Sequence, residues 1–157
     1  MQDSIAAPVK VPAPGEGKRG EAGYLSYLLR QAAGAVRLRL ERRLADLGVT
    51  PPQFLVLTML DAYPGVSGAD IARMASLTPQ TVHGIIGNLE RAGLIVRFAH
   101  PVHGRVRMIA LSKSGRVLLA RCKERAVKAD AQLNTGISPA EEVVIRRWLV
   151  GLATRAE

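Results

Sequence analysis

Residues 67–107 carry a row of hydrogen-bonding side chains followed by a cluster of arginines. The row includes Gln80 and Asn88, whose amide groups can donate and accept hydrogen bonds at the edges of bases. Guanidinium groups such as those of Arg105 and Arg107 pair with phosphate oxygens. These residue types indicate contact with DNA if the elements that carry them form one surface.

Two short helices are expected to position the polar row. Ser67 has the N-cap position of a helix that ends near Ala75, and Thr78 has that of a second helix, which Gly93 ends. Apolar residues recur at spacings of three and four in the second helix and predict its buried face: Val82, Ile85, Ile86 and Leu89. The opposite face then carries Gln80, Thr81, His83, Gly84, Gly87 and Asn88.

This opposite face lacks the Lys–Glu pairs of an ordinary surface helix. Gly84 and Gly87 cost helix stability, but they remove side-chain bulk where another surface must approach closely. The combination favours a helix that enters a major groove, where Gln80 can pair with adenine and Thr81 and His83 can contact neighbouring bases or phosphates. A surface helix without any partner is the alternative. The candidate phosphate contacts at the two helix starts are Ser67 and Thr78.

Beyond the second helix the apolar pattern changes from helical to alternating. Residues 94–99 and 106–111 are rich in β-branched side chains and are separated by a turn-rich segment, which predicts a β-hairpin. Arg105 at its tip and Arg107 beyond it are candidates for a minor groove or for phosphates, and Arg97 for anchoring the first strand. Each arginine could instead be a solvated strand residue.

These segments together resemble the MarR-type winged-helix transcriptional regulators. The matching pieces are a long first helix, the two short helices of residues 67–93, the passage LERAGLIVR (89–97), the hairpin and the passage ALSKSGR (110–116). The resemblance covers about residues 22–152. It implies a fold that is mainly α with a small β-hairpin wing (α+β), in which a winged helix-turn-helix binds double-stranded DNA.

The hairpin departs from the family pattern at one position. Members of the family commonly have an Asp followed closely by arginines in the wing, whereas here His103 stands at the Asp position and Arg105 at that of an arginine. A carboxylate that would orient the wing arginine is therefore missing. Either His103 substitutes for it or the wing is held differently, and both residues are DNA-binding candidates.

Apolar periodicity continues outside the winged segment. It predicts a long helix from Ala22 to about Leu47, a helix opened by Thr50 that runs to about Ala62, a basic helix from Ser114 to about Leu133, and a last helix opened by Ser138. The expected organisation is a disordered N-terminal arm at 1–20, a dimerisation helix at 21–48, the winged helix-turn-helix domain at 49–112 and C-terminal dimerisation helices at 113–157.

The resemblance implies a homodimer, and the apolar stripes of the terminal helices agree with a partner surface that includes Trp148. A two-fold dimer predicts a pseudo-palindromic operator with half-sites roughly 10 to 10.5 base pairs apart. The analogy with the family favours repression over activation.

Family members usually bind small anionic or aromatic molecules, which implies an effector for this chain as well. Arginines along the first helix could receive a carboxylate or the phosphates of a coenzyme A thioester, with aromatic residues as neighbours. The candidate ligand-binding residues are Tyr24, Tyr27, Arg30, Arg37, Arg39 and Phe54. These arginines could instead form a solvated helix face or contact DNA.

Composition limits the class of protein. The chain has 157 residues, of which 48% are hydrophobic, and no apolar run approaches the roughly 18 residues of a membrane span. Without a secretion signal in its first 20 residues, we predict a cytoplasmic protein. The net charge of +9 includes +7 within residues 70–130, which suits a phosphate-binding face, although a basic solubilising surface is the alternative. Enzyme and cofactor motifs are absent, so neither catalysis nor a cofactor is predicted.

Cys122 and the histidines offer other sensing chemistries. Cationic neighbours would favour a reactive Cys122 thiolate, but its place in a helical apolar pattern favours a packed thiol. His100 and His103 are close in sequence but lack a third ligand, so no metal site is predicted. An architectural DNA-binding protein, with no effector and little sequence discrimination, is a further alternative.

Overall fold

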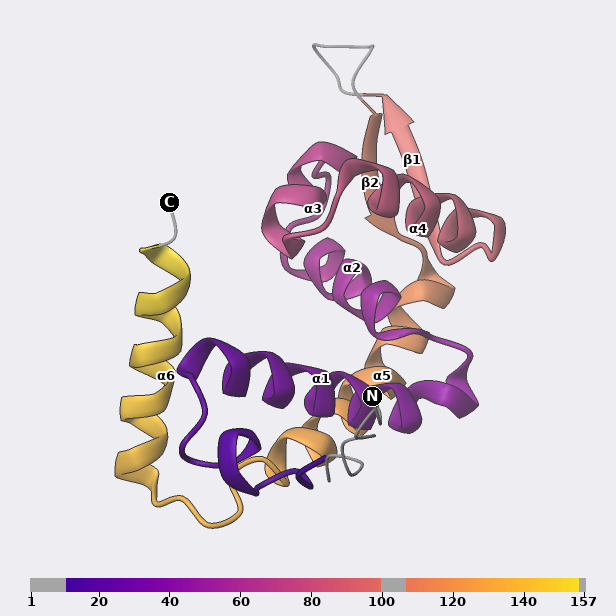
Figure 1. Ribbon diagram of the computed structural model, residues 1–157. Coiled ribbons are helices and arrows are strands. Elements are labelled where there is room, and N and C mark those ends of the chain that lie inside the picture. The colour runs from indigo at the N-terminus through magenta and orange to yellow at the C-terminus, as the bar shows by residue number, and fades with distance from the viewer. Residues whose placement is uncertain (1–10, 100–106, 156–157) are drawn as a thin grey trace, which may run out of the picture. The chain divides into compact units, whose positions relative to one another are not determined.

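The computed structural model of the chain describes residues 11–99 and 107–155, which form six α-helices, two short 3-10 helices and one hairpin (Figure 1). The elements in order are η1 (Gly17–Arg19), α1 (Leu25–Leu44), η2 (Ala45–Leu47), α2 (Pro51–Ala62), α3 (Gly68–Ala75), α4 (Pro79–Arg91), β1 (Ile95–Ala99), β2 (Arg107–Leu111), α5 (Lys113–Ala131) and α6 (Pro139–Thr154). The predicted fold class, mainly α with a small β-hairpin, is confirmed. No helix in these described ranges is long and apolar enough to cross a membrane.

The chain divides into two compact units, residues 1–38 and 39–157. In the first unit, residues 11–20 form a turn and η1, where Arg19 donates to the Pro12 carbonyl at 2.7 Å. Residues 11–20 of the expected arm thus contain local turn hydrogen bonds, and its disorder stays a prediction. Residues 1–10 of the expected arm lie outside the described residues.

Hydroxyl side chains begin most helices of the second unit. Thr50, Ser67, Thr78 and Ser138 each accept a hydrogen bond from the backbone N–H three residues later, as their sequence context predicts. The start of α5 is a correction, since Ser112 caps it rather than Ser114. The helix also ends at Ala131, two residues before the expected Leu133.

One hydrophobic core joins α2, α3, α4, the hairpin and α5. The predicted buried face of α4 is confirmed, since all four of its apolar side chains have lost nearly all contact with solvent. Each large apolar side chain that is fully buried contributes about 1.5 to 3 kcal/mol, so this face holds α4 firmly in place. The opposite, polar face of α4 is consequently held toward solvent.

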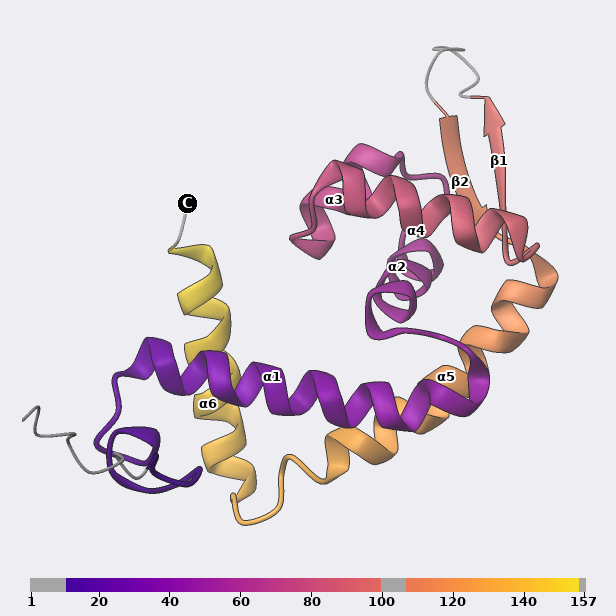
Figure 2. The ribbon, with the colours of Figure 1, turned by 45° about the vertical axis from the view of Figure 1, so that its right-hand side comes forward.

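The hairpin is antiparallel and pairs Ile95 with Leu111, Arg97 with Ile109 and Ala99 with Arg107. On the other edge of β2, Ile109 exchanges hydrogen bonds of 3.0 and 3.2 Å with the α2–α3 connection. The base of the hairpin is buried, because apolar residues occupy the strand positions close to the core. The arginines of the hairpin lie nearer its tip. The hairpin projects beyond α3 and α4 in both ribbon views (Figure 2). Its tip, residues 100–106, lies outside the described residues.

Candidate nucleic-acid interface

The exposed face of α4 carries the polar side chains that the sequence assigns to it. Gln80, Thr81, His83 and Asn88 are all exposed. Two of them are engaged locally, since the Thr81 hydroxyl lies 2.8 Å from that of Thr78 and the Asn88 amide oxygen accepts from Arg91. Gln80 and His83 have no hydrogen-bond partner within the part of the chain that the structure describes. These two side chains are therefore available to bind another molecule.

Gly84 and Gly87 lie on the same side of α4. A Cβ atom added at either position would meet no atom within 4 Å. Nothing within the described structure therefore requires glycine there, and both glycines leave a smooth backbone surface between the polar side chains. This absence of an internal reason agrees with a surface shaped for close approach by another molecule.

The start of α3 differs from the expectation for Ser67. The Ser67 hydroxyl donates to the Asp70 carboxylate at 2.6 Å, and the Ser67 backbone N–H donates to the same oxygen at 3.0 Å. These hydrogen bonds lower the pKa of Asp70, so the carboxylate stays charged beside the cap. Because its only O–H is used and an anion lies next to it, Ser67 is a poorer phosphate ligand than its position suggests.

The two described arginines of the hairpin lie beside α4 on one face of the strands. With His83 they surround a shallow depression of about 250 Å³ between α3, α4 and the hairpin. The residues lining it are Gly68, Ala69, Pro79, Val82, His83, Ile86, Arg97, Arg107 and Ile109. The structure thus brings together His83, Arg97 and Arg107, three of the predicted DNA-binding residues, from separate elements.

Glu90 is a residue that the sequence reasoning missed. Its carboxylate lies 2.8 Å from the Arg97 guanidinium and joins the end of α4 to β1. Arg107 has no ion-pair partner within the described ranges. The two arginines therefore differ in available charge, although their sequence context is alike. Glu90 and Arg97 are seven residues apart in the sequence, and only the turn between α4 and β1 brings their side chains together.

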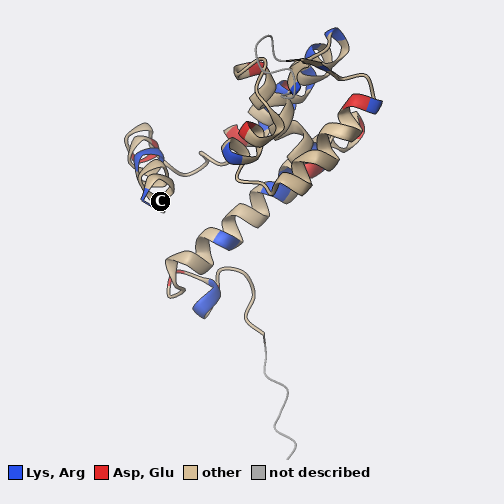
Figure 3. Ribbon diagram, turned by 90° about the horizontal axis from the view of Figure 1, so that it is seen from above, with Lys and Arg blue, Asp and Glu red and all other residues tan. Residues whose placement is uncertain are grey.

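The wing-tip candidates His103 and Arg105 lie outside the described residues, so the question of the missing Asp stays open. Lys and Arg residues elsewhere are interspersed with Asp and Glu along the ribbon (Figure 3). Several cations are paired, including Lys123 with Asp61 at 2.6 Å and Arg125 with Asp46 at 2.8 Å. The charge of Arg107, which has no ion-pair partner within the described ranges, therefore indicates a phosphate-binding surface more specifically than the net charge of the chain does.

The chain that carries this surface is similar to known proteins. The model of the MarR family matches residues 47–106. The HTH-type transcriptional repressor Rv2887 of Mycobacterium tuberculosis is 34% identical over 130 residues, covering 83% of this chain and 94% of the relative. This chain belongs to the MarR family. It is therefore a transcriptional regulator that binds DNA and has no catalytic activity.

Solved structures agree with this membership of the MarR family. The repressor CouR bound to a 23-mer DNA duplex has a TM-score of 0.78 at 29% identity, covering 87% of this chain and 96% of CouR. CouR of Rhodococcus jostii RHA1 bound to p-coumaroyl-CoA has a TM-score of 0.77 at 26% identity, covering 84% and 93%. The Mycobacterium tuberculosis protein Rv2887 in complex with salicylic acid has a TM-score of 0.68 at 33% identity, covering 84% and 98%.

The six ligand-binding candidates of this MarR-family chain fall in both units. Four belong to residues 1–38, whereas Arg39 and Phe54 belong to residues 39–157, and each unit is described by itself. Tyr24 is exposed, with the Lys18 ammonium 5.5 Å from its ring centroid. Phe54 is half-buried against the hydrophobic core, so its ring already has a structural role.

The thiol of this MarR-family chain is packed inside the protein. Cys122 has none of its surface exposed, and burial raises the pKa of its thiol although the nearby Arg121 opposes that shift. A buried thiol that stays protonated is a poor redox sensor, so the packed interpretation is favoured. Within the described residues, no group of three His, Cys, Asp or Glu side chains is arranged to hold a metal ion.

Proposed function

We propose that this MarR-type transcriptional repressor binds a pseudo-palindromic operator as a homodimer in the cytoplasm and leaves it when a small anionic or aromatic molecule binds. The observation that carries the DNA-binding part is the exposed polar face of α4 held beside the arginines of the hairpin. An α-helix fits the major groove, and a hairpin beside it reaches the flanking backbone or minor groove.

Within this interface, Gln80 reads a base and the neighbouring residues hold the duplex. Its amide is exposed and unpartnered within the described region, so it can form two hydrogen bonds with adenine. Thr81 and His83 lie near Gln80 on the exposed face of α4, Asn88 lies about two turns further along it, and Gly84 allows the backbone to approach. Arg97, Arg107 and the wing-tip residues His103 and Arg105 contact phosphates or the minor groove, as does Thr78 at the start of α4.

A second copy of the chain is supported by the exposed apolar surface of α6. None of its residues is buried, and Trp148 remains 38% exposed. Other large apolar residues on this helix are also exposed: Val143, Val144, Ile145, Leu149, Val150 and Leu152. An apolar helix without a covering surface favours association, and a two-fold dimer places two α4 helices at half-sites about one DNA turn apart.

The effector class is suggested by the relatives. CouR binds p-coumaroyl-CoA and Rv2887 binds salicylic acid, and both molecules join an aromatic ring to anionic or acyl groups. In this chain the arginines Arg30, Arg37 and Arg39 of α1 offer charge of the matching sign. An aromatic acid or its coenzyme A thioester is consequently the proposed effector.

The proposal is tested by a gel shift of the full chain on the DNA upstream of its own gene at physiological salt. Random DNA serves as the competitor, and salicylate and p-coumaroyl-CoA are added separately. A complex that resists random DNA and dissolves with one compound is the expected result. Equal competition by random DNA would contradict the proposal and favour the architectural alternative.

A further inference from the structure

Glu90 is the only acidic residue of α4, and the strands β1 and β2 carry none. Its carboxylate lies 2.8 Å from the Arg97 guanidinium, and both side chains are partly open to solvent, 42% for Glu90 and 29% for Arg97. Arg97 also lines the depression between α3, α4 and the hairpin. An anion is therefore in contact with one of the cations that the proposed function places against DNA phosphates.

Other cations of this surface are not paired with an acid. Arg107 has no ion-pair partner within the described ranges. Arg91, at the end of α4, donates to the amide oxygen of Asn88, which is a neutral partner. Glu90 consequently offsets the positive charge at Arg97 and leaves that of Arg91 and Arg107 in place.

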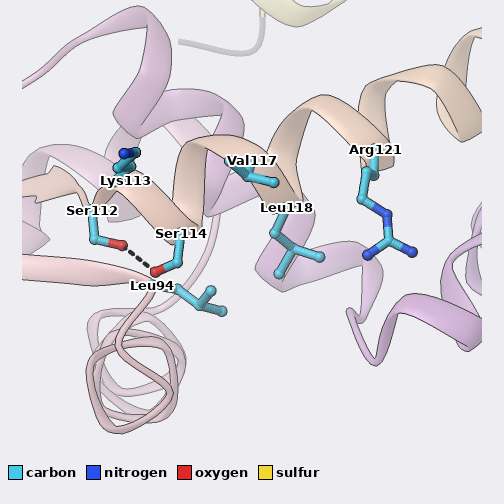
Figure 4. Close-up of a pocket in the computed structure, with 7 residues that line it drawn as sticks. All are labelled: Leu94, Ser112, Lys113, Ser114, Val117, Leu118 and Arg121. Atoms are coloured by element: carbon cyan, nitrogen blue, oxygen red, sulfur yellow. Dashed lines mark hydrogen bonds between the residues drawn. The ribbon is translucent and has the colours of Figure 1, made fainter.

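The hairpin does not depend on this ion pair for its position. Buried side chains fix its base, and the turn between α4 and β1 is held by the start of α5. There the Ser112 and Ser114 hydroxyls donate to the Gly93 carbonyl at 2.7 and 2.8 Å, and the Ser112 N–H donates to the Leu94 carbonyl at 3.0 Å. Figure 4 shows both serines close to Leu94. A partly exposed ion pair adds little stability to such a framework, so the main effect of Glu90 is on charge.

We propose that Glu90 is a built-in competitor of DNA phosphates for Arg97. A guanidinium pairs with a carboxylate and with a phosphate through the same donors. A phosphate that reaches Arg97 must displace the carboxylate or bind an arginine that is already neutralised, and the carboxylate repels it in either case. This inference rests on the proposed function, because it takes the surface of α4 and the hairpin as the DNA interface.

The competition acts on the sequence-independent part of DNA affinity. That part depends on how many phosphates the protein neutralises, and the chain has a net charge of +9 to supply it. The base contact proposed for Gln80 does not involve Glu90. All DNA sequences therefore lose one strong phosphate contact, and a larger share of the remaining affinity for the operator comes from base contacts.

The test is fluorescence anisotropy of the full chain on a random-sequence duplex at several salt concentrations. Glu90→Gln keeps the shape of the side chain and removes its charge. It should bind about fivefold tighter at roughly 0.1 M salt, and the slope of log affinity against log salt should steepen by about 0.9, as expected for one more phosphate contact. In the double variant with Arg97→Gln both gains should be lost, because no arginine is released.

Asp61→Asn is the matched control. It changes the net charge by the same amount and releases Lys123 from an ion pair of 2.6 Å, and neither residue lines the depression. Its salt slope should equal that of the wild type. An equal gain for Asp61→Asn would overturn the proposal, because net charge alone would then explain tighter binding. Weaker binding by Glu90→Gln would also overturn it, since the carboxylate would then position Arg97 for DNA.

Arg107→Gln separates failure of this inference from failure of the proposed function. If Arg107→Gln lowers the salt slope while Glu90→Gln leaves affinity and slope unchanged, only the inference is overturned. If neither variant changes the slope, the hairpin does not face DNA, and the proposed interface is wrong together with the inference.

Discussion

The Glu90 carboxylate on α4 and the Arg97 guanidinium on β1 form an ion pair of 2.8 Å. The end of the candidate recognition helix is therefore joined to the first strand of the wing by a side-chain contact as well as by the chain itself. Since the pair neutralises Arg97, the two described arginines of the hairpin should contribute unequally to DNA binding.

Replacement of each arginine by Gln tests this difference. Arg107→Gln should lower affinity for all DNA sequences alike and reduce the slope of log affinity against log salt by about 1, because one phosphate contact is lost. Arg97→Gln should change the slope by less, since its charge is already paired. Fluorescence anisotropy at several salt concentrations measures both slopes. A larger change for Arg97→Gln than for Arg107→Gln would contradict the assignment.

Gln80→Ala addresses sequence reading. If the amide pairs with a base, its loss should cost about 1 to 3 kcal/mol of discrimination for the operator while affinity for random DNA stays the same. Lys128→Gln on α5 provides a control distant in sequence from α4. Competition binding with operator and random duplexes gives the ratio directly, and an unchanged ratio would exclude Gln80 from base contact.

Gly84→Ala separates stability from DNA binding. The added methyl group meets nothing within 4 Å, and Ala is the better helix former, so the free energy of unfolding should rise by about 0.5 to 1 kcal/mol. Operator affinity should nevertheless fall, because the methyl group lies where DNA approaches. Urea unfolding and gel shift measure the two effects. A Gly84→Ala variant that is more stable than the wild type and binds the operator with the same affinity would show that this part of α4 does not contact DNA.

Gly115→Ala is the contrasting glycine variant. Its Cβ atom would lie 1.9 Å from the Leu94 carbonyl oxygen, which belongs to backbone that cannot simply turn away. We expect a loss of about 3 kcal/mol or more in the free energy of unfolding, at the upper end of overpacking costs. A loss below 1 kcal/mol by urea unfolding would mean that the turn at Leu94 adjusts easily.

The Ser67–Asp70 capping box should make stability depend on acid. Hydrogen bonds from the Ser67 hydroxyl and N–H lower the pKa of Asp70 in the folded state. The stabilisation is therefore fully present above the usual pKa of about 4 and is lost as the pH falls through the lower, folded value. Asp70→Asn should lose less stability than the wild type between neutral pH and pH 3. Thermal unfolding across that range checks it, and parallel curves for the two proteins would refute the linkage.

Cys122 should be inert in the native protein. Because the thiol is buried and its pKa is raised, reaction with a thiol reagent should require unfolding. Mild peroxide treatment should leave operator binding unchanged. Cys122→Ser should destabilise the fold by about 1 to 3 kcal/mol, since a polar hydroxyl would replace a thiol that is packed in the apolar core. Rapid labelling under native conditions would revive the redox alternative.

The sequence by itself determined the local elements of this protein. Capping residues such as Thr50 and Ser138, the helix-ending Gly93 and the apolar spacing of α4 act over a few residues, so their effects can be recognised without a fold. The same local signals misplaced the start of α5, because Ser112 and Ser114 are equally good caps in isolation. In the folded chain both hydroxyls donate to the Gly93 carbonyl, and only that of Ser112 also accepts the Gly115 N–H at the start of the helix.

Only the tertiary structure decided which residues share a surface. The pairing of Glu90 with Arg97 and the depression that His83 and Arg107 line together both involve separate elements. Such contacts depend on how strands and helices turn and pack, and distance along the chain does not specify this. The polarity of α4 could be predicted because it repeats along one helix, whereas the free or paired state of each arginine could not, because the partner lies on another element.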